Sequence, residues 1–560
     1  MPQQLGSGEL AESADPGGIV GPLDRGLTVL RALAAGPEGR QRPGDLVHAT
    51  GLARSTVDRI TTTLLSLGYL RAEGRDLLLT PQAMTLGSGY LACCRLPDVL
   101  GPCAAELADA LDESVSLAVP DGDGVRFITQ VIHRRAMSLA FRIGDLLPPE
   151  RCAPGPLFAA GWSGEDGRRW LERLRADPGG TGFPAVPAPS GPLDAAAVER
   201  RFLARVAAAR EQGWSVDDQL IEPGLVAVAL PVRDASGTAV CALSVVSHTS
   251  RHSAASLADH ALPHLRRTAA RMEASLRDAP PYESNRPARP ADESELKNRL
   301  GAEFLQSLAR GLAVLRALGT RSEGLSLSRV AEATGQPRAT ARRSLLTLTH
   351  LGYVRAGQRT FTLTPRVLDL GYAPLSGLGF TDVVQPHLAA LTALLGESSS
   401  VAVLDGDDVR YVARMATVRI MSVNITVGTR FPAYATAMGR VLLADLPAAG
   451  RAAYLARVRP RRLTRHTRTG AAELAAAIEA AGKDGFALVD EELEEGLRSV
   501  AVPLRSADGR VVAALNVAQH AGRGSREQML DRIRPAATAA AERIAADLAI
   551  VGERRELTIP

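Results

Sequence analysis

The sequence contains one pattern twice, and this duplication limits the possible folds more than any other feature. Arg25-Gly26-Leu27 recurs as Arg310-Gly311-Leu312, an offset of 285 residues. Later pairs have an offset of 284 and then, after one length change, of 272, as in Gly68 with Gly352 and Gly213 with Gly485. Self-similarity at a fixed spacing is the mark of a repeated structural unit, so the chain predicts two copies of one unit of roughly 250 residues.

Composition narrows the class of protein without naming a function. The 560 residues are 46% hydrophobic and 22% charged, as in ordinary globular proteins. A net charge of +4 is too small to mark a nucleic-acid binder by itself. The five cysteines form no CxxC pair, so we expect neither a disulfide framework nor a zinc site. Without a signal sequence or a long apolar run, the chain predicts a soluble, cytoplasmic protein with no membrane partner.

Each copy divides into two parts of different periodicity. Helical periodicity dominates the first part, whereas β-rich runs alternate with Ala-rich helical stretches in the second. The fold class is therefore α+β: an all-α module, then an α/β module with a largely antiparallel sheet, twice over. A Pro-rich and charged stretch separates the copies and reads as a linker. The expected domains are 20–90 and 91–272 in the first copy, a linker at 273–300, and 301–373 and 374–552 in the second copy.

The helical modules have the pattern of a winged helix-turn-helix. In the first, apolar residues on both sides bracket Gly51, where two helices must turn sharply and a residue tolerant of positive φ is needed. A Leu-Gly-Tyr sequence and a short basic hairpin, typical of a wing, follow in both copies. The candidate DNA-binding residues are Arg54, Ser55, Thr56, Arg59, Arg71 and Arg75 in the first copy, and Arg338, Thr340, Arg342, Arg343, Arg355 and Arg359 in the second.

Charge separates the two helical modules. Residues 45–75 carry four arginines and three acidic residues, net +1, whereas residues 329–359 carry six arginines and one acidic residue, net +5. Neutralised phosphates supply the affinity that is independent of sequence, so the second copy should provide most of it. A helix-turn-helix kept only for packing or dimerisation remains the alternative, because such patterns are short and degenerate.

Two longer motifs in the second copy add a family resemblance. Together with Arg-Gly-Leu and the winged helix, the segments 432–440 (PAYATAMGR) and 496–503 (GLRSVAVP) resemble the IclR family of bacterial transcriptional regulators. The second copy is most similar to the subgroup that responds to protocatechuate, p-hydroxybenzoate or β-ketoadipate. The resemblance implies a GAF-like effector domain behind each winged helix and DNA-binding heads paired in dimers. The expected partners are double-stranded operator DNA and a small carboxylate or aromatic-acid effector, with no cofactor.

The resemblance also places an effector site in the second copy. The helix expected to start at Thr436 offers N–H groups to a carboxylate. The strands opposite it provide polar side chains, and the preceding segment provides apolar walls. The effector-binding candidates are Met421, Val423, Thr436, Ala437, Met438, Gly439, Ser499 and Asn516. Without the resemblance, Ser499 and Asn516 would be read as core residues.

The first copy departs from this site. Pro154 and Pro156 remove two N–H donors from the corresponding loop, and Ala227 and Ser244 stand where the second copy has Ser499 and Asn516. We therefore expect the first site to have altered specificity or to be lost. One chain with two heads further predicts an intrachain pseudo-dimer, with a homodimer as a further possibility.

Other functions have weaker support in the sequence. We expect no enzyme and no catalytic residue, because no nucleophile elbow, P-loop or dinucleotide-binding turn is shared by both copies. Pairs of histidines such as His248 and His252 lack the further ligands of a metal site, so none is expected. The leading interpretation is an effector-responsive regulator of aromatic-acid catabolism. The alternatives are an assembly protein whose winged helices only dimerise and, less favoured, an enzyme that uses the α/β pocket.

Overall fold

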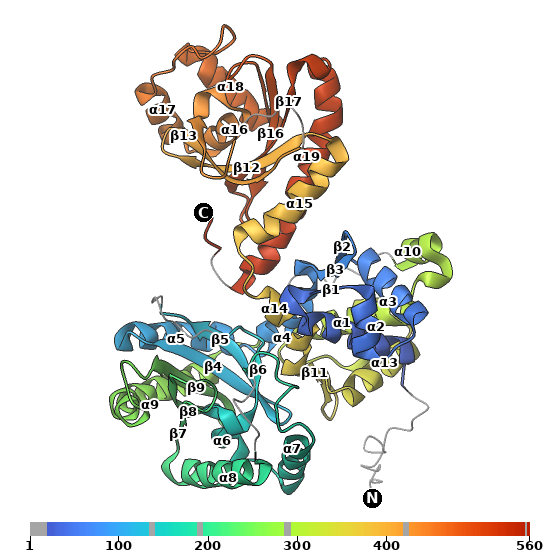
Figure 1. The fold of residues 1–560 in the computed structure, drawn as a ribbon, viewed down its shortest axis with the longest axis vertical. Helices are drawn as coiled ribbons and strands as arrows, with labels where there is room; N and C mark the ends of the chain where they lie inside the picture. The colour runs from blue at the N-terminus through green and yellow to red at the C-terminus, as the bar shows by residue number, and fades with distance from the viewer. Residues whose placement is uncertain (1–18, 134–140, 188–193, 285–292, 418–424, 555–556) are drawn as a thin grey trace, which may run out of the picture. The chain divides into compact units, whose positions relative to one another are not determined.

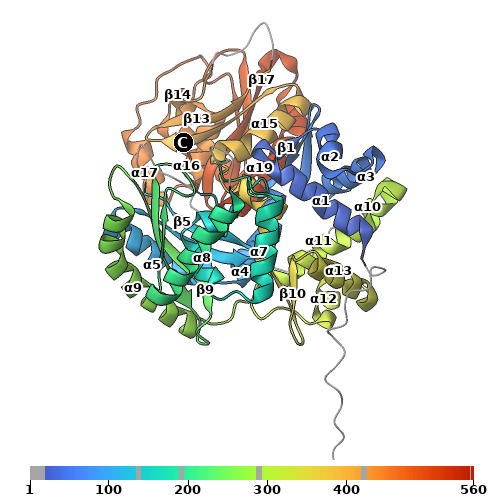
Figure 2. The ribbon, with the colours of Figure 1, turned by 60° about the horizontal axis from the view of Figure 1, so that its bottom comes forward.

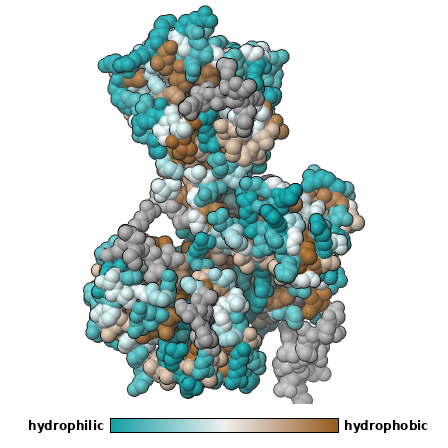
Figure 3. Space-filling view, viewed as in Figure 1, coloured by the Kyte–Doolittle hydropathy of each residue, from teal (hydrophilic) through white to brown (hydrophobic). Residues whose placement is uncertain are grey.

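The chain forms two compact units. A computed structural model describes residues 19–133, 141–187, 194–284, 293–417, 425–554 and 557–560. The first unit, Met1–Gly377, contains both helix-turn-helix modules and the first α/β module; the second, Leu378–Pro560, is the second α/β module, orange to red in Figure 1. On the face shown in Figure 3, hydrophilic residues cover most of both units. In the described part of the chain, no helix is long and apolar enough to cross a membrane.

The two helix-turn-helix modules have matching elements. In the first head these are α1 (Gly21–Ala35), α2 (Pro43–Thr50), α3 (Arg54–Ser66), and the strands β1 (Arg40–Gln41), β2 (Leu70–Glu73) and β3 (Asp76–Leu79). In the second they are α11 (Gln306–Leu318), α12 (Leu327–Thr334), α13 (Arg338–His350), β10 (Val354–Ala356) and β11 (Phe361–Leu363). Gly51 and Gly335 end α2 and α12 at φ values of 66° and 64°, in the left-handed region that the sequence predicts for these turns.

The two heads pack against each other through α1 and α11 within the first unit (Figure 2). The interface is reciprocal: a Cβ on Gly26 would lie 2.4 Å from the Leu308 side chain, and a Cβ on Gly311 would lie 2.3 Å from that of Leu23. The hydrogen bonds are reciprocal too, because Val20 N–H donates to Thr347 Oγ1 and Leu305 N–H donates to Thr63 Oγ1, each at 3.0 Å. Equivalent residues thus meet across a pseudo-two-fold axis inside one chain.

Filling this interface should separate the heads. In the Gly26→Ala/Gly311→Ala variant each new methyl group meets a leucine that has no free space, and such overpacking costs about 1–3 kcal/mol per site. Affinity for DNA from the region upstream of its own gene, measured by fluorescence anisotropy, should fall about tenfold or more. Gly44→Ala is the matched control, because nothing lies within 4 Å of a Cβ there. Equal affinities of the two variants would show that head pairing does not assist DNA binding.

The segments that follow the two wings also pack against each other within the first unit. Helix α4 (Pro81–Cys93) packs against the second copy's η5 (Pro365–Leu370) and α14 (Tyr372–Leu375). The first α/β module joins this cluster through Arg126, which is 1% exposed and bonds Asp121 Oδ2 at 2.5 Å, the Gly144 carbonyl at 2.6 Å and Asp369 Oδ1 at 2.7 Å. Thr85 is the first-copy equivalent of Asp369, so the acidic partner exists in one copy only.

Both α/β modules have the same six-stranded antiparallel sheet. The strand orders are β6-β5-β4-β9-β8-β7 and β14-β13-β12-β17-β16-β15. The first module consists of α5 (Leu96–Leu111), β4 (Ser114–Asp121), β5 (Gly124–Val131), β6 (Leu146–Leu147), η3 (Pro149–Arg151), α6 (Pro154–Ala159), α7 (Gly164–Ala176), α8 (Ala195–Gln212), β7 (Ser215–Asp218), β8 (Leu225–Arg233), β9 (Ala239–His248) and α9 (Ala254–Asp278). The second consists of α15 (Phe380–Leu395), β12 (Ser398–Asp405), β13 (Asp408–Met415), β14 (Arg430–Pro432), η6 (Ala433–Ala435), α16 (Ala437–Asp445), α17 (Ala448–Arg457), α18 (Ala471–Asp484), β15 (Ala487–Asp490), β16 (Leu497–Arg505), β17 (Val511–His520) and α19 (Arg526–Val551).

The second unit has two hydrophobic cores, one on each face of its sheet, because side chains that alternate along a strand point to opposite faces. Val500 and Val502 on β16 face α15 and α19, whereas Ala501 between them faces α16. Side chains with a period of two point to opposite faces of a sheet, so these strands are covered by helices on both sides. The predicted α+β class with a largely antiparallel sheet is confirmed.

The expected linker is more structured than its composition indicates. Helix α9 continues to Asp278, and α10 occupies Glu293–Leu300. Between them, Tyr282 N–H donates to Ser322 Oγ at 3.0 Å and Ser284 N–H donates to the Thr320 carbonyl at 2.8 Å. The expected linker at 273–300 therefore includes helical and paired segments, because proline and charge do not stop a segment from pairing along a neighbouring module. Its bounds stay a prediction.

Candidate functional site

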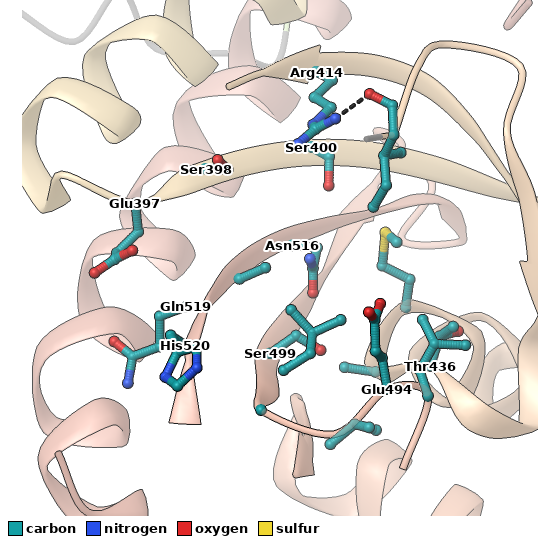
Figure 4. Close-up of a pocket in the computed structure, with 18 of the residues that line it drawn as sticks. Glu397, Ser398, Ser400, Arg414, Thr436, Glu494, Ser499, Asn516, Gln519 and His520 are labelled. Atoms are coloured by element: carbon teal, nitrogen blue, oxygen red, sulfur yellow. Dashed lines mark hydrogen bonds between the residues drawn. The ribbon is translucent and has the colours of Figure 1, made fainter. Parts of the chain in front are cut away.

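The second unit contains a cavity of about 850 Å³, within the usual size range of small-molecule sites. It lies between the end of the sheet, the start of α16 and the loop before β16 (Figure 4). Of the predicted effector residues, Thr436, Ala437, Met438, Ser499 and Asn516 line it. Met421 and Val423 lie outside the described residues.

A row of polar side chains crosses three neighbouring strands in this cavity. Ser400 on β12 pairs with Arg414 on β13 and with Asn516 on β17. Residues paired across adjacent strands point to the same face, so the three side chains follow one another along the cavity wall, as Figure 4 shows. Ser400 and Asn516 are each 4% exposed, and no described donor bonds Asn516 Oδ1. Most buried acceptors in folded proteins have a partner, so this one is a candidate contact for a donor on a bound molecule or an ordered water.

Arg414 is the main site residue that the sequence analysis missed. Strict alternation from Tyr411 would direct residues 413 and 415 into the cavity, but a β-bulge shifts the register between Val401 and Ala402. The bulge gives β13 one extra residue, so that Arg414 faces the cavity. The Arg414 guanidinium donates to the Ile425 carbonyl, and burial lowers its pKa. Arg414 provides a positive charge in a partly desolvated wall, where an anion would be bound strongly.

The start of α16 supplies backbone donors, but fewer than predicted. Thr436 caps the helix, and its Oγ1 accepts from Gly439 N–H at 2.9 Å. Gly439 N–H is therefore occupied by the cap, and Gly439 is not among the residues that line the cavity, so its place in the effector site stays a prediction. A Cβ on Gly439 would lie 2.0 Å from the Ala433 carbonyl oxygen, so the glycine permits close packing of α16 on η6. Ala437 and Met438, the first two helical residues, have N–H groups without an intrahelical acceptor.

The first copy fills the corresponding space with apolar side chains. Phe127 and Phe141, the equivalents of Tyr411 and Ile425, stack with ring centroids 4.8 Å apart. They belong to one apolar cluster with the equivalents of Thr436, Ala437, Leu493 and Ser499, which are Cys152, Ala153, Ile221 and Ala227. Arg151, the equivalent of Ala435, bonds the carbonyls of Leu220 and Ile221 at 3.0 and 2.8 Å. The polar row itself has polar equivalents in the first copy, Gln130, Ser116 and Ser244, but these lack the positive charge of Arg414.

The predicted DNA-binding residues lie on the expected elements. The two recognition-helix sets lie on α3 and α13, where the arginines are exposed and Thr56 and Thr340 are half-buried. Arg75 and Arg359 are exposed in the hairpin turns, and Arg355 is exposed on β10. Arg71 lies on β2, half-buried.

Two first-copy arginines have partners within the protein. Arg59 donates to the Ala302 carbonyl at 2.6 Å, and Arg71 pairs with Glu73 at 2.7 Å. Gly357 stands where Glu73 would be in the second copy, so Arg355 has no such acidic neighbour at that position. Fewer arginines of the first head than of the second are therefore without a partner inside the protein that competes with phosphate.

Metal chemistry has no support in the described residues. Within them, no group of three or more histidine, cysteine, aspartate or glutamate side chains is placed to hold a metal ion.

Comparison with known protein families identifies both kinds of domain. The IclR helix-turn-helix domain matches residues 22–74 and 307–357, and the bacterial transcriptional regulator IclR C-terminal domain matches residues 195–274 and 373–546. The Pca regulon regulatory protein of Pseudomonas putida is 44% identical over 239 residues, which is 42% of this chain and 82% of that protein. The p-hydroxybenzoate hydroxylase transcriptional activator of Acinetobacter baylyi is 33% identical over 253 residues, 44% of this chain and 92% of that protein.

Among solved structures, a putative transcriptional regulator from Rhodococcus sp. RHA1 is 52% identical, covers 44% of this chain and 99% of its own, and has a TM-score of 0.43. Each of the two sequence relatives corresponds to less than half of this chain, as expected if the chain holds two units. Both family domains occur twice, in the same order. The chain therefore belongs to the IclR family of bacterial transcriptional regulators and contains the family's pair of domains in tandem.

Proposed function

We propose that this chain regulates genes of aromatic-acid catabolism, binding its operator with two heads of one chain and its effector in the cavity of the second copy. The observation that carries the proposal is the row Arg414, Ser400 and Asn516 in a cavity of about 850 Å³. The first copy has the uncharged Gln130, Ser116 and Ser244 at these positions, next to an apolar cluster at the equivalents of Thr436, Ala437 and Ser499. The relatives named for the Pca regulon and for p-hydroxybenzoate hydroxylase support the aromatic-acid class.

The cavity favours an acid that also carries a hydroxyl group. Arg414 and the first N–H groups of α16 are donors suited to a carboxylate. Asn516 Oδ1 is an acceptor and requires a donor, which a carboxylate at neutral pH lacks and a hydroxyl group supplies. Exposed Glu494 and Glu495 at the cavity rim disfavour a second carboxylate at that end. Protocatechuate and p-hydroxybenzoate have the required combination.

Calorimetric titration of the full chain tests the effector proposal. With p-hydroxybenzoate, protocatechuate and β-ketoadipate as probes, we expect one aromatic acid to bind with a stoichiometry of one per chain. The packed first copy is the reason for one site rather than two. Two sites per chain would show that the first copy also binds the effector. Binding abolished by changes in the first module but not in the second would show that the effector site lies in the first copy.

The heads should contribute unequally to operator affinity. Arg342→Ala/Arg343→Ala should lower the slope of log affinity against log salt by about 1.8, since each lost phosphate contact changes it by about 0.9. Arg54→Ala/Arg59→Ala should change it less, because Arg59 bonds Ala302 and Arg54 lies 3.9 Å from Asp58. Anisotropy titrations at several salt concentrations measure both slopes, and equal changes would refute the asymmetry.

The same titrations distinguish a DNA-binding regulator from a protein whose winged helices only dimerise. A protein whose winged helices serve only packing would show no steep salt dependence with any duplex. Sedimentation of the complex gives the number of chains: we expect one chain on each operator, whereas two chains would indicate a homodimer.

A further inference from the structure

The two recognition helices have different surfaces at equivalent positions. Residues four apart lie above one another on a helix. One outward-facing strip of α3 therefore contains the exposed Arg54 and Asp58 and the half-buried Thr62. The equivalent strip of α13 contains the exposed Arg338, Arg342 and Leu346. We call these the first and second recognition strips. They begin with the same residue and then differ in charge and polarity.

The residues that differ between the two recognition strips lie on the helices that would contact DNA bases. The N-terminal part of a recognition helix contacts base edges in the major groove. Asp58 has a side chain 52% exposed, 3.9 Å from Arg54, and Arg342 is also exposed. Leu346 is 46% exposed. These side chains are free to meet a ligand on the outer side of each helix.

The chemistry of each strip selects a different base. An arginine donates two hydrogen bonds to guanine O6 and N7, whereas a carboxylate accepts from an amino group, foremost cytosine N4. Phosphates repel the Asp58 carboxylate, so a base edge rather than the backbone is its favourable contact. An exposed leucine suits a thymine methyl group, and Thr62 in the first strip is smaller and polar.

Head pairing places these different strips at corresponding positions. The reciprocal contacts of Gly26 with Leu308 and of Gly311 with Leu23 relate the heads by a pseudo-two-fold axis. In a homodimer of a single-copy relative the two strips would be identical and would match a palindrome. Here Asp58 stands at the place that symmetry assigns to Arg342.

We propose that the operator is not a palindrome: its half-site for the second head has guanine opposite Arg342, and the half-site for the first head has an amino-bearing base, cytosine foremost, at the symmetric position opposite Asp58. This inference rests on the proposed DNA-binding function. Asp58, Arg342 and Leu346 are its specificity-determining residues.

Selection of binding sites from a random duplex library with the full chain tests the inference. We expect two non-identical half-sites, and about tenfold tighter binding to this hybrid duplex than to an inverted repeat of the second half-site. In the Asp58→Arg/Thr62→Leu variant, the first recognition strip has the same three residue types as the second. At the same salt concentration this variant should bind the inverted repeat more tightly than the hybrid duplex. Asp109→Arg, an exposed position in the first α/β module, is the charge-matched control and should leave the preference unchanged.

The outcomes are distinguishable. A palindromic motif selected by the unchanged chain, or an unchanged preference in the Asp58→Arg/Thr62→Leu variant, would overturn the asymmetric operator while leaving DNA binding intact. Failure to enrich any sequence would overturn the DNA-binding function itself, and this inference with it.

Discussion

The Arg414→Met variant should bind p-hydroxybenzoate or protocatechuate roughly 10- to 150-fold more weakly than the unchanged chain in calorimetric titrations. The estimate follows from a hydrogen bond to a charged group, typically worth about 1.5–3 kcal/mol. Arg414 lines the cavity wall beside Ser400, and its guanidinium is partly desolvated, so water cannot replace it efficiently at a bound carboxylate. Methionine keeps a similar length and removes only the charge and the donors.

The controls separate a lost contact from a damaged fold. Arg510→Met removes an exposed arginine of the same unit that pairs with Asp508, and it should leave effector affinity unchanged. Asn516→Leu should weaken the effector response about tenfold or more, with DNA binding in the absence of effector nearly intact. Asn516→Ser, which introduces the residue found at this position in the first copy, should give an effector affinity between those of the unchanged chain and of Asn516→Leu. Full affinity in Arg414→Met would show that the carboxylate is bound elsewhere.

The Glu492→Leu variant should lose about 3–5 kcal/mol of the unfolding free energy of the second unit. Glu492 and Arg440 are 4% and 2% exposed and form two hydrogen bonds of 2.8 and 2.6 Å. Removing the carboxylate leaves a buried guanidinium without its charge partner. The first copy has Pro156 and Leu220 at these positions, so the fold itself accepts an apolar pair. Arg440→Leu/Glu492→Leu should therefore cost much less than Glu492→Leu alone.

Two spectroscopic signals can follow the two modules separately. All three tryptophans, Trp162, Trp170 and Trp214, lie in the first α/β module, whereas circular dichroism reports both modules. In urea, Glu492→Leu should move an early transition in circular dichroism to lower concentration and leave the tryptophan fluorescence transition in place. A shift of both signals together would mean that the modules unfold as one, and a double variant as unstable as the single one would contradict the buried-charge argument.

Local sequence was sufficient for the elements that depend on local chemistry. The positive-φ glycines at 51 and 335, the Leu-Gly-Tyr segments and the basic hairpins predict the helix-turn-helix modules, because turn geometry depends on a few adjacent residues. The pairing of Tyr282 and Ser284 with residues of the second head was not predictable for the opposite reason, because it depends on a partner remote in sequence.

The effector site was predictable only in part. Thr436 follows from a helix start that is visible in the sequence, whereas Asn516 follows from the family resemblance. Arg414 does not, since the β-bulge of β13 breaks the alternation that assigns side chains to faces. Gly439 appears in the right segment, but its N–H group is taken by Thr436, a contact that only the folded cap reveals.

The sequence by itself determined the duplication, the order of the domains, the family and the unequal charge of the two heads, because these are written in repeated motifs and in residue counts. The tertiary structure decided which side chains meet: the pairing of α1 with α11, the bond that holds Arg59 to Ala302, the apolar filling of the first module and the entry of Arg414 into the cavity. Those features arise from contacts between residues far apart in the chain, and a one-residue shift in strand register is enough to turn a side chain from a core to a binding site.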